Sequence, residues 1–175
     1  MLSCKPTKGI ETMLCFSYGS NMSSKRLLAR LSSASFVMVA RLPYYRLAFH
    51  KAGTDGSGKG DIVPASAQAE VYGVVWEIPD TQKAVLDSFE GLGFGYDEIT
   101  ITVFDLTTDK PMDVQAYIAT RTRSGLKPYD WYKNHVINGA REHGLPEHYI
   151  AALEAVKALE DKKRKRFEQE VAIYQ

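Results

Sequence analysis

Residues 13–21 read MLCFSYGSN, an apolar run that turns abruptly into a polar loop. Residues 22–31, which follow, are rich in hydroxyl and charged side chains and carry leucines at helical spacing. This order predicts a buried strand, a tight loop and a short helix. Gly19 supplies backbone freedom in the loop, and we expect Ser20 or Asn21 to cap the helix.

A loop of this kind can bind an anion or an oxyanion. It offers backbone N–H groups without partners and the positive end of a helix dipole. By spacing alone, a plain capped strand-to-helix turn explains the same residues at least as well. The rest of the sequence has to decide between the two interpretations.

Length and composition predict one globular domain without a nucleic-acid or membrane partner. A chain of 175 residues with 45% hydrophobic content can bury a sizeable core. The 22 basic and 21 acidic residues nearly cancel, so we expect no nucleic-acid partner. No apolar run reaches membrane-spanning length, and residues 1–9 lack the apolar block of a leader. We therefore expect no membrane partner and a cytoplasmic location.

The pattern of elements favours an α+β fold with a mixed, curled sheet. Strands dominate the first two thirds of the chain and helices the end, without strict alternation. The expected strands are 13–18, 36–42, 44–50, 71–78, 96–104 and 114–119, and the expected helices are 22–31, 80–90 with Asp80 or Thr81 as cap, 128–143 and 146–159. The predicted organisation is a flexible N-terminal tail over 1–12, one domain over 13–160 and a charged helical tail over 161–175.

Three patterns resemble functional motifs and are better explained otherwise. Residues 53–60, GTDGSGKG, nearly form a phosphate-binding loop, but Gly60 replaces the hydroxyl residue and no helix follows, so we expect a mobile surface loop over 53–61. The four histidines are not at metal-ligand spacing, and no CxxC pair exists, so we expect no metal site. The basic run 162–166 is interleaved with acidic residues, which indicates a solvated helix face.

One carboxylate stands out. Glu90 follows an apolar helical stretch and precedes the glycine-rich, aromatic segment 91–96, GLGFGY. Partial desolvation there would raise its pKa and make it a usable acid and base near neutral pH. Taken alone, the segment fits an ordinary helix-end glutamate equally well.

Read together, the motifs resemble the gamma-glutamylcyclotransferase family. The resemblance rests on YGSN at 18–21, VYGVVW at 71–76, LDSFEG at 86–91 with Tyr96 downstream, and GAREHGLP at 139–146 with Tyr132 before it and Tyr149 after it. Each piece is moderately specific, and their order and spacing together are strongly specific. The resemblance spans residues 13–157.

The resemblance implies a small mixed β-barrel with flanking helices and an enzyme without metal or cofactor. Members of the family cyclise a gamma-glutamyl group and release 5-oxoproline and the attached amino acid or amine. Glu90 matches the catalytic glutamate, here the general acid and base. The implied substrate-binding residues are Phe16, Ser17, Tyr18, Gly19, Ser20, Asn21, Tyr96, Tyr117 and Tyr132.

Departures from the family pattern are small. Ser17 stands where many relatives have alanine, and Met22 where leucine is common, and neither change removes a reacting group. Asn21 argues against the glutathione-specific branch, which carries a different residue there.

The sequence leaves the activity, the leaving group and the oligomeric state open. The same barrel could hold a small ligand without cyclising it, although a desolvated carboxylate is of little use in a plain binding pocket. The partner we expect is a small gamma-glutamyl substrate, whose leaving group is an amino acid, a lysine side chain or another amine. A homodimer is one oligomeric state that the sequence leaves open.

Overall fold

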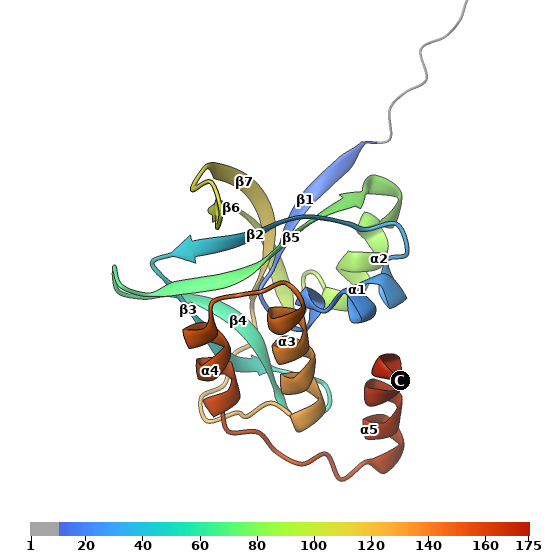
Figure 1. Cartoon of the computed structure of the whole chain (residues 1–175). Helices are drawn as coiled ribbons and strands as arrows, with labels where there is room; N and C mark the ends of the chain where they lie inside the picture. The colour runs from blue at the N-terminus through green and yellow to red at the C-terminus, as the bar shows by residue number, and fades with distance from the viewer. Residues whose placement is uncertain (1–10) are drawn as a thin grey trace, which may run out of the picture.

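Five strands close into a barrel in the order β1-β5-β2-β6-β7 in this computed structural model, which describes residues 11–175 (Figure 1). All neighbours are antiparallel except β1 and β7, which pair in parallel. The predicted α+β fold with a small mixed barrel is therefore confirmed. The barrel strands are β1 (Thr12–Ser17), β2 (Ser35–Pro43), β5 (Glu70–Pro79), β6 (Tyr96–Asp105) and β7 (Pro111–Ala119).

Strand β5 is the most buried strand of the barrel. It pairs with β1 on one edge and β2 on the other, and seven of its ten residues are buried. Its glycine is required by a close approach, because a Cβ on Gly73 would lie 2.4 Å from the carbonyl oxygen of Ser17 and 2.7 Å from the ring of Phe16. No other residue fits there without moving the end of β1.

A hairpin of β3 (Tyr45–Ala52) and β4 (Gly58–Pro64) forms a separate two-stranded sheet next to α3 and α4 (Figure 1). The prediction of a mobile loop over 53–61 was wrong beyond Ser57, because β4 begins at Gly58. The carboxylate of Asp55 closes the turn by accepting the Ser57 N–H at 3.0 Å and pairing with the Lys59 ammonium at 2.7 Å. The lysine of the phosphate-loop-like motif is thus used inside the turn.

The helices lie outside the barrel (Figure 1). They are η1 (Ser20–Met22), α1 (Ser24–Arg30), α2 (Asp80–Glu90), α3 (Asp130–Glu142), α4 (Glu147–Ala155), α5 (Arg164–Val171) and η2 (Ala172–Tyr174). None of the helices formed by residues 11–175 is both long and apolar enough to cross a membrane.

Three predicted helix ends need correction. Ser20 and Asn21 do not cap α1, because they form the 3₁₀ turn η1, and the Ser23 side chain accepts the capping bond from the Arg26 N–H. Neither Asp80 nor Thr81 caps α2, because both lie inside the helix and Pro79 takes the cap position.

The last predicted helix, 146–159, ends early. Helix α4 stops at Ala155, and Val156 is extended. Leu159 instead exchanges backbone hydrogen bonds with the segment before α3, donating to Pro128 at 2.8 Å and accepting from Asp130 at 2.9 Å. Leu159 has helical spacing from Val156, but its backbone pairs with the segment before α3 and does not continue the helix.

The C-terminal segment packs against α1 and α3. Glu170 of α5 pairs with Arg26 and lies 2.9 Å from the buried His135 ring, and Tyr174 lies 2.7 Å from the same ring. The hydroxyl of Tyr174 donates to the hydroxyl of Ser23, the cap residue of α1, at 2.9 Å. The predicted tail 161–175 therefore contacts the domain. Of the predicted N-terminal tail 1–12, residues 1–10 lie outside the described residues, and Thr12 belongs to β1.

Candidate active site

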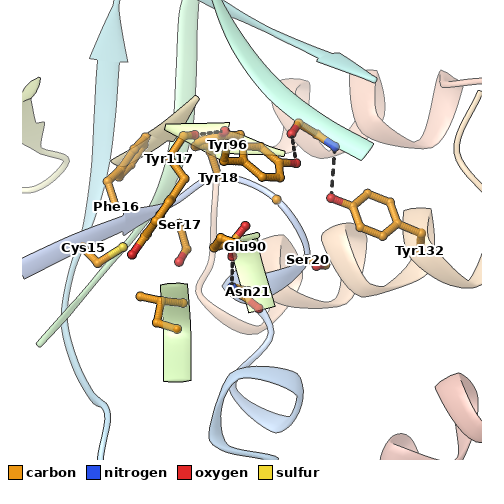
Figure 2. Close-up of a pocket in the computed structure, with 13 residues that line it drawn as sticks. Cys15, Phe16, Ser17, Tyr18, Ser20, Asn21, Glu90, Tyr96, Tyr117 and Tyr132 are labelled. Atoms are coloured by element: carbon orange, nitrogen blue, oxygen red, sulfur yellow. Dashed lines mark hydrogen bonds between the residues drawn. The ribbon is translucent and has the colours of Figure 1, made fainter. Parts of the chain in front are cut away.

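One pocket brings together all ten predicted catalytic and substrate-binding residues (Figure 2). It is narrow, about 50 Å³. Its wall consists of β1 and the loop after it, the end of α2, and residues from β4, β6, β7 and α3. The predicted residues that line it are Phe16, Ser17, Tyr18, Gly19, Ser20, Asn21, Glu90, Tyr96, Tyr117 and Tyr132.

Three lining residues escaped the sequence analysis: Cys15, Gly60 and Leu86. Cys15 and Leu86 have the apolar pattern of core residues, and nothing in that pattern distinguishes a core position from a pocket wall. Burial raises the pKa of the Cys15 thiol far above its ordinary value, so it is an inert wall rather than a nucleophile. Gly60 reaches the pocket only because the β3–β4 hairpin folds back beside α3.

The polar loop turns sharply where β1 ends. The carbonyl of Gly19 accepts the Met22 N–H at 3.1 Å, and that of Ser20 accepts the Ser23 N–H at 3.3 Å. The first N–H groups of such a turn have no partner within it. Within residues 11–175, no hydrogen bond is recorded from the N–H groups of Gly19, Ser20 or Asn21, so the turn offers donors at the pocket wall.

Helix α3 holds this loop in place. A Cβ on Gly139 would lie 2.4 Å from the backbone nitrogen of Ser23 and 2.5 Å from the carbonyl carbon of Met22. The glycine therefore lets the loop rest directly on the helix. This contact gives a physical role to the Gly-Ala of the late motif, and the neighbouring Ala140 is fully buried.

The carboxylate of Glu90 faces the loop from the end of α2. Gly91, which follows, takes the left-handed conformation (φ 66°) that ends the helix at this residue. The Asn21 side-chain amide donates to Glu90 Oε1 at 2.9 Å (Figure 2). Burial raises the pKa of Glu90, while the charges of Arg30 and Lys51 counteract part of that rise.

Three tyrosines line the pocket together with Glu90, and backbone groups hold their hydroxyls. Tyr96 donates to the carbonyl of Gly60 at 2.7 Å, and the N–H of Gly60 donates to the hydroxyl of Tyr132 at 3.0 Å. Tyr18 donates to the backbone carbonyl of Tyr117. Burial raises the pKa of Tyr18, Tyr96 and Tyr132, so these hydroxyls stay protonated at neutral pH.

The fourth tyrosine is fixed from outside the pocket. The Tyr117 hydroxyl donates to Asp87 Oδ1 at 2.6 Å, and the same carboxylate pairs with Lys83 at 2.5 Å. The pocket thus combines neutral hydroxyls, free N–H donors and one carboxylate with a raised pKa. Such a set can bind a polar acyl group and move protons beside it.

Metal ligands do not gather here. Among residues 11–175, no group of three or more His, Cys, Asp or Glu side chains is placed to hold a metal ion. That the protein uses neither metal nor cofactor stays a prediction.

Comparisons with known proteins agree with one another. A model of the AIG2-like family matches residues 70–153. The mouse protein named gamma-glutamylcyclotransferase is 33% identical over 156 residues, covering 87% of this chain and 82% of the relative. The human protein of the same name is 33% identical over 159 residues, covering 87% and 84%. A solved structure described as a gamma-glutamyl cyclotransferase superposes with a TM-score of 0.84 at 30% identity, covering 94% of this chain and 99% of that one.

Proposed function

The chain belongs to the gamma-glutamylcyclotransferase family, and on that premise we propose that Glu90 moves the protons of its reaction. The reaction is the cyclisation of a gamma-glutamyl group to 5-oxoproline, with release of the attached amino acid or amine. The observation that carries the assignment to Glu90 is its half-buried carboxylate at the pocket wall, hydrogen-bonded by the amide of Asn21.

Cyclisation needs one base and one acid in turn. The carboxylate of Glu90 takes a proton from the α-ammonium of the substrate, and the free amine attacks the γ-carbonyl. A carbon–nitrogen bond forms and closes the five-membered ring, while the carbonyl oxygen gains the negative charge. When that charge collapses back, the old amide bond breaks, and the leaving nitrogen takes the proton from Glu90. The ring nitrogen then gives its second proton to the ionised Glu90, which passes it to the released amine, so the products are the neutral lactam and an ammonium.

The raised pKa of Glu90 supports this double role. A carboxyl group with an ordinary pKa is a weak base for an ammonium and is almost never protonated at neutral pH. Burial moves the pKa of Glu90 toward the working pH, where both proton transfers become efficient. Catalysis of this kind is typically worth about 10²–10⁴-fold.

The N–H groups of Gly19, Ser20 and Asn21 supply the electrostatic part. Two groups need such donors, the α-carboxylate of the substrate and the oxyanion of the tetrahedral intermediate. Tyr96 and Tyr132 line the same pocket and shape it around a folded substrate, so that amine and carbonyl meet.

Glu90→Gln tests the assignment. The amide keeps the shape of the side chain but neither accepts nor donates the required proton, so we expect the turnover number to fall by at least about 10²-fold. Asp80→Asn is the matched control, an exposed acid in the first turn of the same helix, and should keep full turnover. Wild-type turnover in the Gln variant would refute the role of Glu90.

The leaving group is tested with a substrate panel. Gamma-glutamyl amino acids, gamma-glutamylamines including gamma-glutamyl-ε-lysine, and glutathione are incubated with the enzyme, and 5-oxoproline is followed by mass spectrometry. Because Asn21 differs from the glutathione-specific branch, we expect little product from glutathione. If no substrate gives 5-oxoproline, the pocket is a binding module.

Three broader proposals follow the sequence-based predictions. We propose acyltransfer as the reaction class, a cytoplasmic location and a homodimer as the assembly. Cell fractionation tests the location, and light scattering of the purified chain tests the assembly.

A further inference from the structure

We propose that Arg30 is a positioning residue that orients the amide of Asn21 and, through it, the carboxylate of Glu90. The inference rests on the proposed role of Glu90. Arg30 lies in the last turn of α1, outside the residues that line the pocket, and no motif in the sequence marked it.

Two consecutive hydrogen bonds, called the relay below, connect Arg30 to Glu90 through the side-chain amide of Asn21. Arg30 Nη1 donates to Asn21 Oδ1 at 3.0 Å, and Asn21 Nδ2 donates to Glu90 Oε1 at 2.9 Å. A guanidinium has only donors, so the amide oxygen has to face Arg30 and the amide nitrogen has to face Glu90. Without Arg30 the amide can rotate and bring its oxygen against the carboxylate, which repels it.

A second contact ties Arg30 to the other end of the relay. Its guanidinium stacks over the ring of Phe89 with 4.7 Å to the centroid, and Phe89 directly precedes Glu90. One side chain thus touches both the loop that carries Asn21 and the helix end that carries Glu90. Loss of either contact frees the relative position of the two segments.

The charge of Arg30 is not neutralised by a close carboxylate. None of the ion pairs within residues 11–175 includes Arg30, in contrast to Arg26 on the same helix, which pairs with Glu170. Burial lowers the pKa of Arg30 to about 10, so it stays charged at neutral pH. Its field therefore acts on Glu90 across the amide.

Other groups share the surroundings of Glu90 and have to be held constant in a test. The cations are Arg26 and Arg30 from α1 and Lys51 from β3, and the neutral titratable groups are Cys15, Tyr18, Tyr96 and Tyr132. Arg30 stands first among the charges that lower the pKa of Glu90. Removing it should raise that pKa further.

The experiment compares three variants of the full chain. Arg30→Met removes charge and donor, Arg30→Lys keeps the charge and loses the planar fork, and Lys25→Met removes an exposed charge from the same helix without touching the relay. The readouts are kcat and KM against pH and the carboxyl titration of Glu90 by NMR in ¹³C-glutamate-labelled protein. The Glu90 signal is assigned as the one missing from Glu90→Gln.

For Arg30→Met we expect kcat to fall about 10–100-fold with little change in KM, as for other residues that orient a reacting group. The NMR midpoint of Glu90 and the acid limb of kcat should move up by about one pH unit, because the reaction needs the ionised carboxylate. Arg30→Lys should return the acid limb of kcat to its wild-type pH but should not restore the full kcat. Lys25→Met should have the wild-type kcat and the wild-type pH dependence.

An unmoved midpoint together with wild-type kcat in Arg30→Met would overturn the inference, as would an equal effect of Lys25→Met. If Arg30→Met does not fold, Arg30→Lys carries the test, since wild-type kcat in that variant contradicts the need for the fork. A shifted midpoint in a protein that cyclises no substrate would leave the positioning role intact and refute the proposed function.

Discussion

Gly139→Ala should displace the loop after β1, on which the proposed substrate binding depends, at its contact with α3. The added Cβ would lie 2.4 Å from the Ser23 nitrogen, 2.5 Å from the Met22 carbonyl carbon and 2.6 Å from Met22 Cβ. Two of these three atoms are backbone, so no side chain can rotate away to make room. The loop has to move by about 1 Å before ordinary contact at 3.4 Å is reached.

Two effects oppose each other in the stability of this variant. Alanine is favoured over glycine inside a helix by about 1 kcal/mol. Overpacking a tight contact costs typically about 1–3 kcal/mol. We expect the steric effect to dominate, because the obstructing atoms are backbone, and the free energy of unfolding to fall by about 1 kcal/mol or more.

The effect on activity should be larger than the effect on stability. A displacement of about 1 Å in a positioning element can cost about 10²-fold in rate. Steady-state kinetics and urea denaturation of the same preparation measure both quantities. Asn134→Ala, at an exposed position of α3, is the control for helix propensity and should stabilise slightly without changing kcat.

A Gly139→Ala variant that behaves like that control would contradict the steric contact. A variant stabilised by about 1 kcal/mol, the pure propensity effect, with wild-type kcat/KM would show that the loop does not rest on Gly139.

Three further perturbations address the pocket and the C-terminal segment. Gly19→Val should raise KM about tenfold or more, because a Cβ there already lies 3.3 Å from the Tyr132 hydroxyl and the branched methyls reach further; an unchanged KM contradicts this. Tyr132→Phe should lower the free energy of unfolding in urea by about 1–3 kcal/mol, since it leaves the buried Gly60 N–H without its acceptor, and an unshifted midpoint would mean that water replaces the hydroxyl. Burial alone would raise the pKa of Glu170, but hydrogen bonding to His135 and the charge of Arg26 lower it to about 2. Because the pKa of Glu170 is lower in the folded than in the unfolded protein, its ionised form stabilises the fold, and the wild type should be more stable than Glu170→Gln at neutral pH by on the order of 2 kcal/mol. This difference in the free energy of unfolding should disappear as the pH falls from about 5 to about 2. A difference that does not depend on pH would contradict the ion pair.

Much of the fold was readable from local patterns. The strands over 13–18 and 71–78 and the helix over 80–90 were predicted to within about one residue, because apolar spacing and glycine stops act on neighbouring residues. The barrel itself came from the family resemblance, since no local pattern states that β1 pairs in parallel with β7 and closes the sheet.

The errors share one cause. Ser20 and Asn21 look like helix caps, and Leu159 has helical spacing, yet the structure uses the first two in η1 and pairs the third with the start of α3. Residues 58–61 look like part of a loop, yet they pair with β3. In each case a tertiary contact outweighed a weak local preference.

The candidate site divides in the same way. The sequence marked the residue types, a carboxylate at a helix end and a glycine loop after a strand. It did not mark Gly60, which hydrogen-bonds Tyr132, a residue 72 positions away. It did not mark Arg30 either, which hydrogen-bonds the nearby Asn21 and through it acts on Glu90.

Residue type, order and spacing were enough to predict most of the elements, the family and the candidate reacting group. The surroundings of that group follow from the packing of the whole chain. The Asn21–Glu90 hydrogen bond joins residues 69 positions apart, and it exists because β1 pairs with β5 and α2, which follows β5, packs against both strands. Burial and the distance to neighbouring charges set the pKa of a carboxylate, and both are properties of the packed chain.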